Sequence, residues 1–272
     1  MTVENNWIQH NLANRFNDHT LSFEVMLKPN SFRTMNFHDA ADYTAKKIYE
    51  KYPKLFLSFS GGADSDYVFH CFQRNNIPFT PILVRTSGNT VELDYAFHTC
   101  RKFNITPVVL ELSDADLLSF FHKEIVNKLN SVGLCAIPGI VACRYARDNS
   151  GVLVIGEHMI DYEEDNIFPA MNEWDFYNEI FVGDEYNIPF FNYTSDLTVA
   201  MINRIESMPI SEWKWQLYNI DYRPIIDYVF LDKTRMLIYN IRNMRTLKTN
   251  THHCFGTKED FINSMKPYQI NC

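Results

Sequence analysis

Hydroxyls, glycines and a carboxylate lie close together in the segment Ser58-Phe59-Ser60-Gly61-Gly62-Ala63-Asp64-Ser65-Asp66. The apolar run 55–57 before it predicts a buried strand, and the mainly apolar run 67–72 after it predicts a helix. Two glycines between a strand and a helix allow a turn that gathers backbone N–H groups and a helix N-terminus around one concavity. Such a concavity favours phosphate, because the N–H groups and the helix dipole both attract negative charge.

A carboxylate distinguishes this loop from the Walker loop, which needs a lysine beside its second conserved glycine to reach the β- and γ-phosphates. Here Ala63 and Asp64 follow Gly62. A carboxylate beside a phosphate site makes sense if it holds a divalent cation that bridges to the phosphates. We therefore expect the loop to bind pyrophosphate and Mg²⁺.

The hexapeptide Ser60-Gly61-Gly62-Ala63-Asp64-Ser65 is similar to the Ser-Gly-Gly-x-Asp-Ser motif of the PP-loop, or N-type ATP pyrophosphatase, superfamily. Members of this superfamily cleave ATP between the α- and β-phosphates to adenylate a substrate, and a nucleophile then displaces AMP. The resemblance implies ATP and Mg²⁺ as ligands and Asp64 as the catalytic residue that holds the metal. It also implies a nucleotide site formed by Ser58, Ser60, Gly61, Gly62, Asp64, Ser65, Gly156 and main-chain atoms near Val84.

A second informative segment begins where the apolar run 152–155 ends at Gly156, since five carboxylates follow within nine residues: Glu157, Asp161, Glu163, Glu164 and Asp165. Like charges so close repel, and a shared Mg²⁺ would relieve the repulsion. The alternative is a solvated acidic loop. The segment resembles the Gly-Glu-x-x-Asp element of the asparagine synthetase and β-lactam synthetase branch. That resemblance implies that Glu157 is catalytic and faces the acyl-adenylate, and that Asp161 binds the metal, although Asp161 falls one residue late for the family spacing.

Three further segments are similar to the same branch: 92–96, 136–147 and 188–200. Asn192 replaces the aspartate that the family carries in the last of these. The resemblance covers roughly residues 40–205. The glutamine-dependent asparagine synthetases also carry a glutaminase domain, for which the residues before the loop leave no room. We therefore expect nitrogen to come from free ammonia, a substrate amine or a separate amidotransferase partner.

The resemblance predicts an ATP-dependent, AMP-forming ligase that joins a small-molecule carboxylate to an amine or ammonia. One alternative is an enzyme of the same fold that activates a nucleobase carbonyl or transfers sulfur. Another is a non-catalytic nucleotide-binding regulator that keeps the loop without the chemistry.

Predicted strands and helices alternate along the chain and position these motifs. Strands are predicted at 20–27, 54–59, 79–85, 106–112 and 151–155, and helices at 39–52, 64–75, 90–103, 114–130 and 138–148. Such alternation is typical of an α/β fold with a doubly wound parallel sheet, which binds ligands at the carboxyl ends of its strands. We expect an N-terminal strand-containing extension over 1–38, a nucleotide-binding core over 39–156, and a smaller, mainly helical substrate-side region over 157–272.

Composition restricts the partners. The formal net charge of −8 argues against a general nucleic-acid binder, which normally presents a basic face. A local basic strip over 235–248 is the alternative docking surface. No apolar run reaches about 18 residues and the start lacks a signal-peptide pattern, so no membrane association and a cytoplasmic location are expected.

The cysteines and lysines leave several roles open. Six dispersed cysteines suit a reducing compartment, and Cys71 and Cys100 are predicted to lie in the core. A zinc site at His252, His253, Cys254 and Cys272 is the less favoured interpretation, because no Cys-x-x-Cys accompanies them. A C-terminal lysine stabilises the adenylate in amide-forming relatives, and the spacing does not choose between Lys214, Lys233 and Lys248.

Overall fold

The computed structural model describes most of the predicted core and parts of the regions on either side of it. The described residues are 8–11, 24–27, 31–120, 123, 137–156, 160–163, 166–169, 187–204, 217–219 and 258–270. All structural statements below concern these residues.

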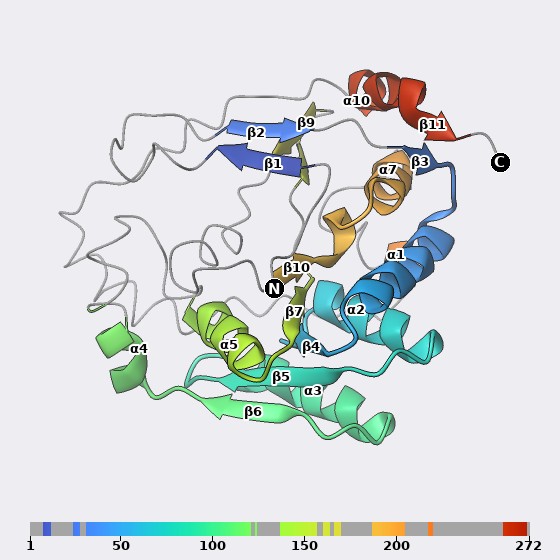
Figure 1. The fold of residues 1–272 in the computed structure, drawn as a ribbon. Coiled ribbons are helices and arrows are strands. Elements are labelled where there is room, and N and C mark those ends of the chain that lie inside the picture. Colours follow the sequence, from blue (N-terminus) through green and yellow to red (C-terminus); the bar gives the residue numbers. More distant parts are fainter. Residues whose placement is uncertain are drawn as a thin grey trace.

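A five-stranded, all-parallel sheet forms the centre of the protein (Figure 1). Its strands lie in the order β10-β7-β4-β5-β6. Apolar side chains occupy both faces of the inner strands, as expected for a parallel sheet covered on two sides. The strands are β4 (Leu55–Ser58), β5 (Thr80–Arg85), β6 (Val108–Glu111), β7 (Val152–Ile155) and β10 (Asn187–Pro189).

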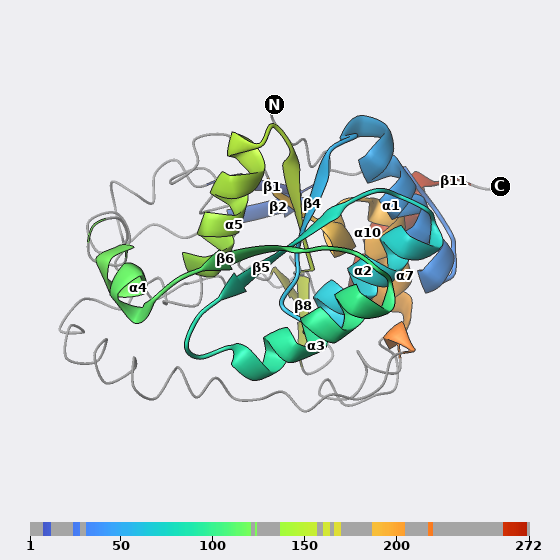
Figure 2. The same ribbon diagram turned by 90° about the horizontal axis from the view of Figure 1, so that it is seen from below.

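Helices cover both faces of the sheet. In Figure 2, α5 lies on one side, whereas α2 and α3 lie on the other. α1 packs against α2 and against α7. The fold is therefore an α/β doubly wound sheet, as the alternation of elements predicted. The helices are α1 (Phe37–Lys51), α2 (Ala63–Arg74), α3 (Thr90–Lys102), α5 (Ile137–Asp148) and α7 (Ser195–Arg204).

The strand order reverses between β4 and β7. From β4 the chain proceeds outward through β5 and β6, and then returns to place β7 and β10 on the opposite side of β4. The register pairs Leu55 with Val152 and Leu57 with Val154, so β4 and β7 end at the same level. In open α/β sheets the crevice outside the carboxyl ends at such a reversal is where ligands bind.

Aromatic side chains fill the core between the sheet and α1, α2 and α7. The largest fully buried side chains are Ile48, Tyr52, Tyr67, Phe37, Phe59, Phe69, Phe72, Phe190 and Phe191. On α1, the buried positions Phe37, Ala40, Ala41, Thr44, Ala45 and Ile48 recur at intervals of three and four residues, as one face of a helix requires. Asn36 caps this helix by accepting a hydrogen bond from the backbone N–H of Asp39.

In the described part of the chain, three two-stranded pairs lie outside the main sheet. β1 (Ile8–Asn11) pairs with β2 (Glu24–Leu27), β8 (Ile160–Glu163) pairs with β9 (Asn166–Pro169), and β3 (Phe32–Arg33) pairs with β11 (Gln269–Ile270). The remaining described elements are the helices α4 (Asp114–Phe120) and α10 (Lys258–Met265) and the short 3-10 helices η4 (Phe190–Asn192) and η5 (Lys266–Tyr268).

The elements predicted between residues 39 and 155 are confirmed to within a few residues at each end, except that the structure describes the predicted helix 114–130 continuously only as far as Phe120. Two features were not foreseen. The acidic segment after Gly156 contains the β8–β9 hairpin, and β10 adds a fifth strand to the main sheet beside β7. The described C-terminal region thus contributes strands as well as helices.

Candidate functional site

The loop between β4 and α2 depends on a glycine in the left-handed region of backbone space. Gly61 has a φ of +84°, which L-residues with a side chain rarely adopt. A Cβ at this position would lie 2.3 Å from the carbonyl oxygen of Glu92 and 3.0 Å from the backbone nitrogen of Ala96. Gly61 therefore lets the loop turn and lets α3 approach its backbone closely.

Two hydroxyls predicted to bind phosphate lie together in this loop. Ser60 is exposed, and its Oγ accepts a hydrogen bond from the backbone N–H of Gly62 at 3.2 Å. Ser65 is buried, and its Oγ donates to the Gly62 carbonyl oxygen at 3.1 Å. The two Oγ atoms are 3.3 Å apart. The loop thus presents a compact group of hydroxyl and amide groups.

Helix α2 begins directly at this group. Gly62 is its N-cap residue and has no side chain that would accept hydrogen bonds from the first-turn N–H groups. The positive end of the helix dipole therefore points at the loop without a capping side chain, which is the arrangement that favours anions. Asp64 and Asp66 lie in the same first turn. Asp66 is buried, accepts a hydrogen bond from Thr99 and pairs with His70, so its role here is to fasten α2 to α3.

The second motif meets the first at Gly156. A Cβ on Gly156 would lie 2.8 Å from the carbonyl carbon of Asp64 and 2.8 Å from the backbone nitrogen of Ser65. Only glycine allows the chain that leaves β7 to lie directly against the first turn of α2. The structure therefore brings together the two segments that the sequence singled out, at the point where the strand order reverses.

Asp64 has a partner that the sequence did not reveal. The hydroxyl of Tyr218 donates a hydrogen bond to Asp64 Oδ1, with 2.5 Å between the two oxygens. A hydrogen bond to a charged group contributes about 1.5–3 kcal/mol net. Tyr218 lies 154 residues after Asp64 in the chain, and no local pattern around it marks it as a site residue.

Tyr218 is held in place by other aromatic rings. It is 3% exposed and stacks on Tyr67, Phe191 and Phe37, with ring centroids 4.6, 5.5 and 6.0 Å away. Burial raises the pKa of Tyr218 well above its usual value, and the negative charge of Asp64 raises it further. The phenol therefore keeps its proton and remains a hydrogen-bond donor at physiological pH.

The end of β5 is stabilised by a side chain that the sequence analysis did not single out. Asn89 Nδ2 donates to the carbonyl oxygen of Val84, and the backbone N–H of Thr86 donates to Asn89 Oδ1. The bond from Asn89 Nδ2 uses one of the two lone pairs of the Val84 carbonyl oxygen, and the adenine contact predicted for main-chain atoms near Val84 stays a prediction. Ser58 is the last residue of β4 and is partly buried.

Several predicted site residues lie outside the described part of the chain. These are Glu157, the side chain of Asp161 in β8, the histidines and cysteines of the zinc interpretation, and Lys214, Lys233 and Lys248. Among the described residues, no three His, Cys, Asp or Glu side chains come together as a metal site. The assignments to Glu157 and Asp161 stay predictions. Cys71 and Cys100 are buried, as predicted, and so is Cys143.

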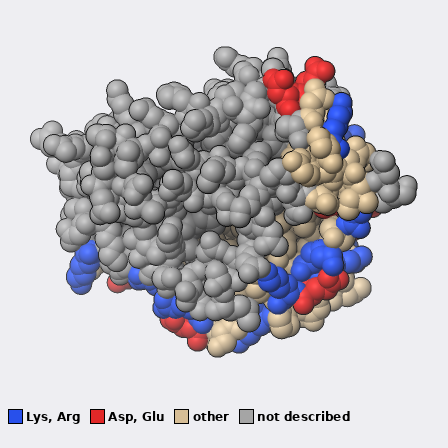
Figure 3. Space-filling view, turned by 45° about the horizontal axis from the view of Figure 1, so that its top comes forward, with Lys and Arg blue, Asp and Glu red and all other residues tan. Residues whose placement is uncertain are grey.

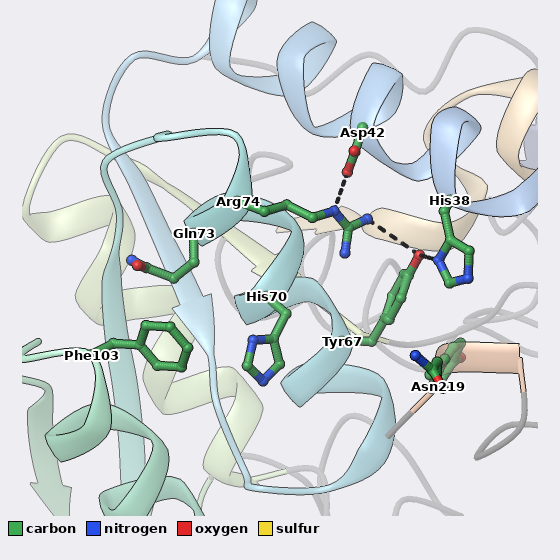
Figure 4. A pocket seen from close by; sticks show the side chains of 9 residues that line it. His38, Asp42, Tyr67, His70, Gln73, Arg74, Phe103 and Asn219 are labelled. Atoms are coloured by element: carbon green, nitrogen blue, oxygen red, sulfur yellow. Dashed lines mark hydrogen bonds and ion pairs between the residues drawn. The ribbon is translucent and has the colours of Figure 1, made fainter. Parts of the chain in front are cut away.

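A cavity of about 700 Å³ lies alongside α2 and is separate from the loop (Figure 4). Figure 4 shows Arg74 between Asp42 and Tyr67. Arg74 Nε lies 2.6 Å from Asp42 Oδ1, and the Tyr67 hydroxyl lies 2.8 Å from His38 Nδ1. Tyr218 is shared between this cavity and the Asp64 site, but no residue of the loop 58–62 lines it. The lining residues are His38, Asp42, Tyr67, His70, Gln73, Arg74, Phe103, Tyr218 and Asn219.

Charges of both signs occur near one another on the described surface that Figure 3 shows. On the face shown in Figure 3, Lys and Arg side chains lie beside Asp and Glu side chains. The ion pairs Lys47–Glu50 and Arg85–Glu111, each with an N–O distance of 2.6 Å, belong to the same pattern. The predicted basic strip over 235–248 lies outside the described residues. None of the described helices combines the length and apolar character that a membrane span requires.

No protein-family model matches the sequence, and no curated protein matches it significantly. The chain is similar in structure to an NH3-dependent NAD synthetase from Campylobacter jejuni, with 19% identity and a TM-score of 0.35 over 46% of this chain and 58% of that one. It therefore spans just over half the length of that synthetase.

Two further solved structures show likenesses of similar strength. An NMN synthetase from Francisella tularensis has 10% identity and a TM-score of 0.36 over 78% of this chain and 97% of its own. A U34-tRNA thiolase from Methanococcus maripaludis has 14% identity and a TM-score of 0.39 over 85% of this chain and 78% of its own. TM-scores this low decide neither substrate nor reaction, so the function has to be argued from the site.

Gly61 and Gly62 differ in how well their positions tolerate a side chain, so their alanine variants form a matched pair. Gly61→Ala is expected to lower the free energy of unfolding by about 1–3 kcal/mol, because the added Cβ meets the backbone of α3. Gly62 has an ordinary φ of −71°, and a Cβ there meets only Ser60 Oγ at 3.3 Å. Gly62→Ala is expected to cost less than about 1 kcal/mol. Urea denaturation measures both values, and equal losses would contradict the assigned role of Gly61.

Acidification is expected to destabilise the protein through His38. His38 is exposed, but partial desolvation lowers its pKa from 6.5, and Arg74 and Arg204 lower it further against the opposing effect of Asp42 and Asp39. The unfolded state therefore takes up this proton first, and the free energy of unfolding falls as the pH drops below about 6.5. His38→Gln keeps an acceptor for the Tyr67 hydroxyl and should flatten this dependence between about pH 7.5 and pH 5.5. If the free energy of unfolding, measured with urea, changes with pH equally in the wild type and in His38→Gln, His38 is not the source of the pH dependence.

Proposed function

We propose that this protein binds ATP and Mg²⁺ at the carboxyl ends of β4 and β7 and activates a substrate by adenylation, releasing pyrophosphate. The observation that carries the proposal is the contact between Gly156 and the first turn of α2. It places the Ser60–Ser65 motif and the start of the acidic segment side by side at the reversal of strand order. The resemblance of both segments to the PP-loop superfamily supports the same reaction class.

The hydrogen-bond donors of the loop suit a polyphosphate. Ser60, Ser65, the loop amides around Gly61 and Gly62, and the N-terminus of α2 would hold the β- and γ-phosphates as the leaving pyrophosphate. Asp64 would hold Mg²⁺, which typically takes one or two carboxylates and completes its coordination with phosphate oxygens and water. The bound ion would neutralise charge that develops as the α–β bond breaks. Adenine would lie toward the end of β5 near Val84.

For the acceptor we propose a small carboxylate. Its oxygen would attack the α-phosphorus as pyrophosphate leaves. The nitrogen of ammonia or of an amine would then attack the acyl carbon, lose a proton and displace AMP to give an amide. Glu157 would face the acyl-adenylate, and Asp161 would be a second metal ligand. The carboxylates that follow Gly156 in the sequence would attract an amine and repel the phosphate backbone of a nucleic acid, so we do not expect nucleic acid as the substrate.

The first test is the bond that is cleaved. Turnover of ATP labelled at the α-phosphate should yield AMP and pyrophosphate, and it should be stimulated by a small carboxylic acid together with an amine donor. ADP and phosphate as products would remove the superfamily assignment. Stimulation by tRNA alone, with binding that weakens steeply as salt rises, would favour the nucleobase-activating alternative.

The second test is Asp64→Asn. The amide oxygen still accepts the Tyr218 hydrogen bond, so thermal unfolding should change little, whereas Mg²⁺-dependent pyrophosphate release should fall by at least about 100-fold. Asp94→Asn is the matched control, since Asp94 is an exposed carboxylate on α3. Survival of activity in Asp64→Asn would mean that the metal is held elsewhere.

A further inference from the structure

Asp64 meets a hydrogen-bond donor that is fixed in position. The 2.5 Å separation between the Tyr218 hydroxyl oxygen and Asp64 Oδ1 lies in the range of hydrogen bonds to an ionised carboxylate. The terminal torsion of an aspartate side chain is broad, so a carboxylate on a helix surface samples many orientations. This bond selects one of them.

The donor itself has little freedom to move. Tyr67 lies on Tyr218 with an interplanar angle of 19°, and the angles to Phe191 and Phe37 are 17° and 20°. Tyr67 and Phe37 belong to α2 and α1, whereas Phe191 precedes α7. Elements from distant parts of the sequence thus fix one phenolic oxygen beside the loop. A rotation of this ring would disturb all three neighbours.

The orientation of a carboxylate matters greatly to Mg²⁺. The ion demands near-ideal octahedral geometry with short bonds, and groups that hydrogen-bond to its ligands orient them and tune affinity. A carboxylate has two oxygens, and Tyr218 occupies one position on Oδ1.

Building on the proposed function, we infer that Tyr218 is a positioning residue, whose phenol holds the Asp64 carboxylate in the orientation that binds Mg²⁺ bridging to the phosphates of ATP. Tyr218 acts on the metal through Asp64 and does not touch the reacting atoms. The opposite arrangement, in which Tyr218 restrains Asp64 and must release it before metal binds, predicts the opposite effect of removing the hydroxyl.

The test measures metal binding without turnover. Isothermal titration with Mg²⁺ in the presence of α,β-methylene-ATP, whose α–β bridge resists cleavage, gives a Kd for the wild type and for Tyr218→Phe. The variant keeps the ring and its stacking and loses only the donor. We expect its Kd for Mg²⁺ to rise about 10-fold or more, with unchanged binding of the analogue in EDTA.

Tyr67→Phe is the matched control. It removes a buried hydroxyl from the neighbouring ring of the same stack, but this hydroxyl faces His38 and Arg74 instead of Asp64. Its Kd for Mg²⁺ should stay within about 2-fold of the wild type. In an Asp64→Asn background, the further change Tyr218→Phe should have no additional effect on Mg²⁺ binding, because the two residues act through one contact.

A spectroscopic measurement does not depend on a Tyr218 variant. Addition of Mg²⁺ to the wild-type complex with the analogue should give a tyrosine ultraviolet difference spectrum, because the metal changes the charge on the acceptor of the Tyr218 bond. The spectrum should be absent in Asp64→Asn. No difference between these two proteins would overturn the inference.

The outcomes separate this inference from the proposed function. If the wild type binds the analogue equally well with and without Mg²⁺, the proposed function and the positioning role of Tyr218 are both wrong. If the wild type needs Mg²⁺ but Tyr218→Phe matches it or binds the metal more tightly, only the positioning role fails. A parallel loss of Mg²⁺ affinity in Tyr67→Phe would also overturn it, since the effect would then belong to the aromatic stack and not to the hydroxyl.

Discussion

Close backbone contact at two glycines is the constraint on which the candidate site depends. Gly61 lies against the backbone of α3, and Gly156 lies against the first turn of α2. Neither contact leaves room for a Cβ, so the loop, α2, α3 and the end of β7 are in direct backbone contact. Packing this tight gives the loop amides fixed positions, and fixed donors bind an anion without the cost of ordering them.

The sequence predicted the core well because the signals there are local. Buried strands such as β4 and β7 are continuous apolar runs, and α1 shows its buried face at helical spacing. β10 was missed because it is three residues long, contains Pro189 and runs directly into the turn before α7. The hairpin after Gly156 was missed because the segment was interpreted from its carboxylates alone, as a metal site or, alternatively, as a solvated loop.

The site shows the same division between local and long-range information. Ser60, Gly61, Gly62, Asp64 and Ser65 are adjacent in sequence, so their types and spacing revealed the loop. Tyr218 comes from a segment 154 residues away, and its role depends on packing among Phe37, Tyr67 and Phe191. Nothing in the spacing of these aromatic residues indicates which tyrosine would reach Asp64. Asn192, which replaces the aspartate of the family motif, is buried in η4 and donates a hydrogen bond to Thr198 Oγ1 in α7.

Electrostatics at the start of α2 explain why nucleotide and metal would bind together. The helix N-terminus favours negative charge, and in the protein alone the carboxylates of Asp64 and Asp66 already supply it. A polyphosphate that approaches the same amides meets a like charge on Asp64, which opposes its binding. A divalent cation between the carboxylate and the phosphates converts that repulsion into attraction on both sides. Tyr218 contributes to the same balance, because the bond that it donates to Oδ1 stabilises the charge on Asp64. Under the proposed function, nucleotide affinity should therefore depend on Mg²⁺ far more than in a Walker loop, where a lysine supplies the positive charge.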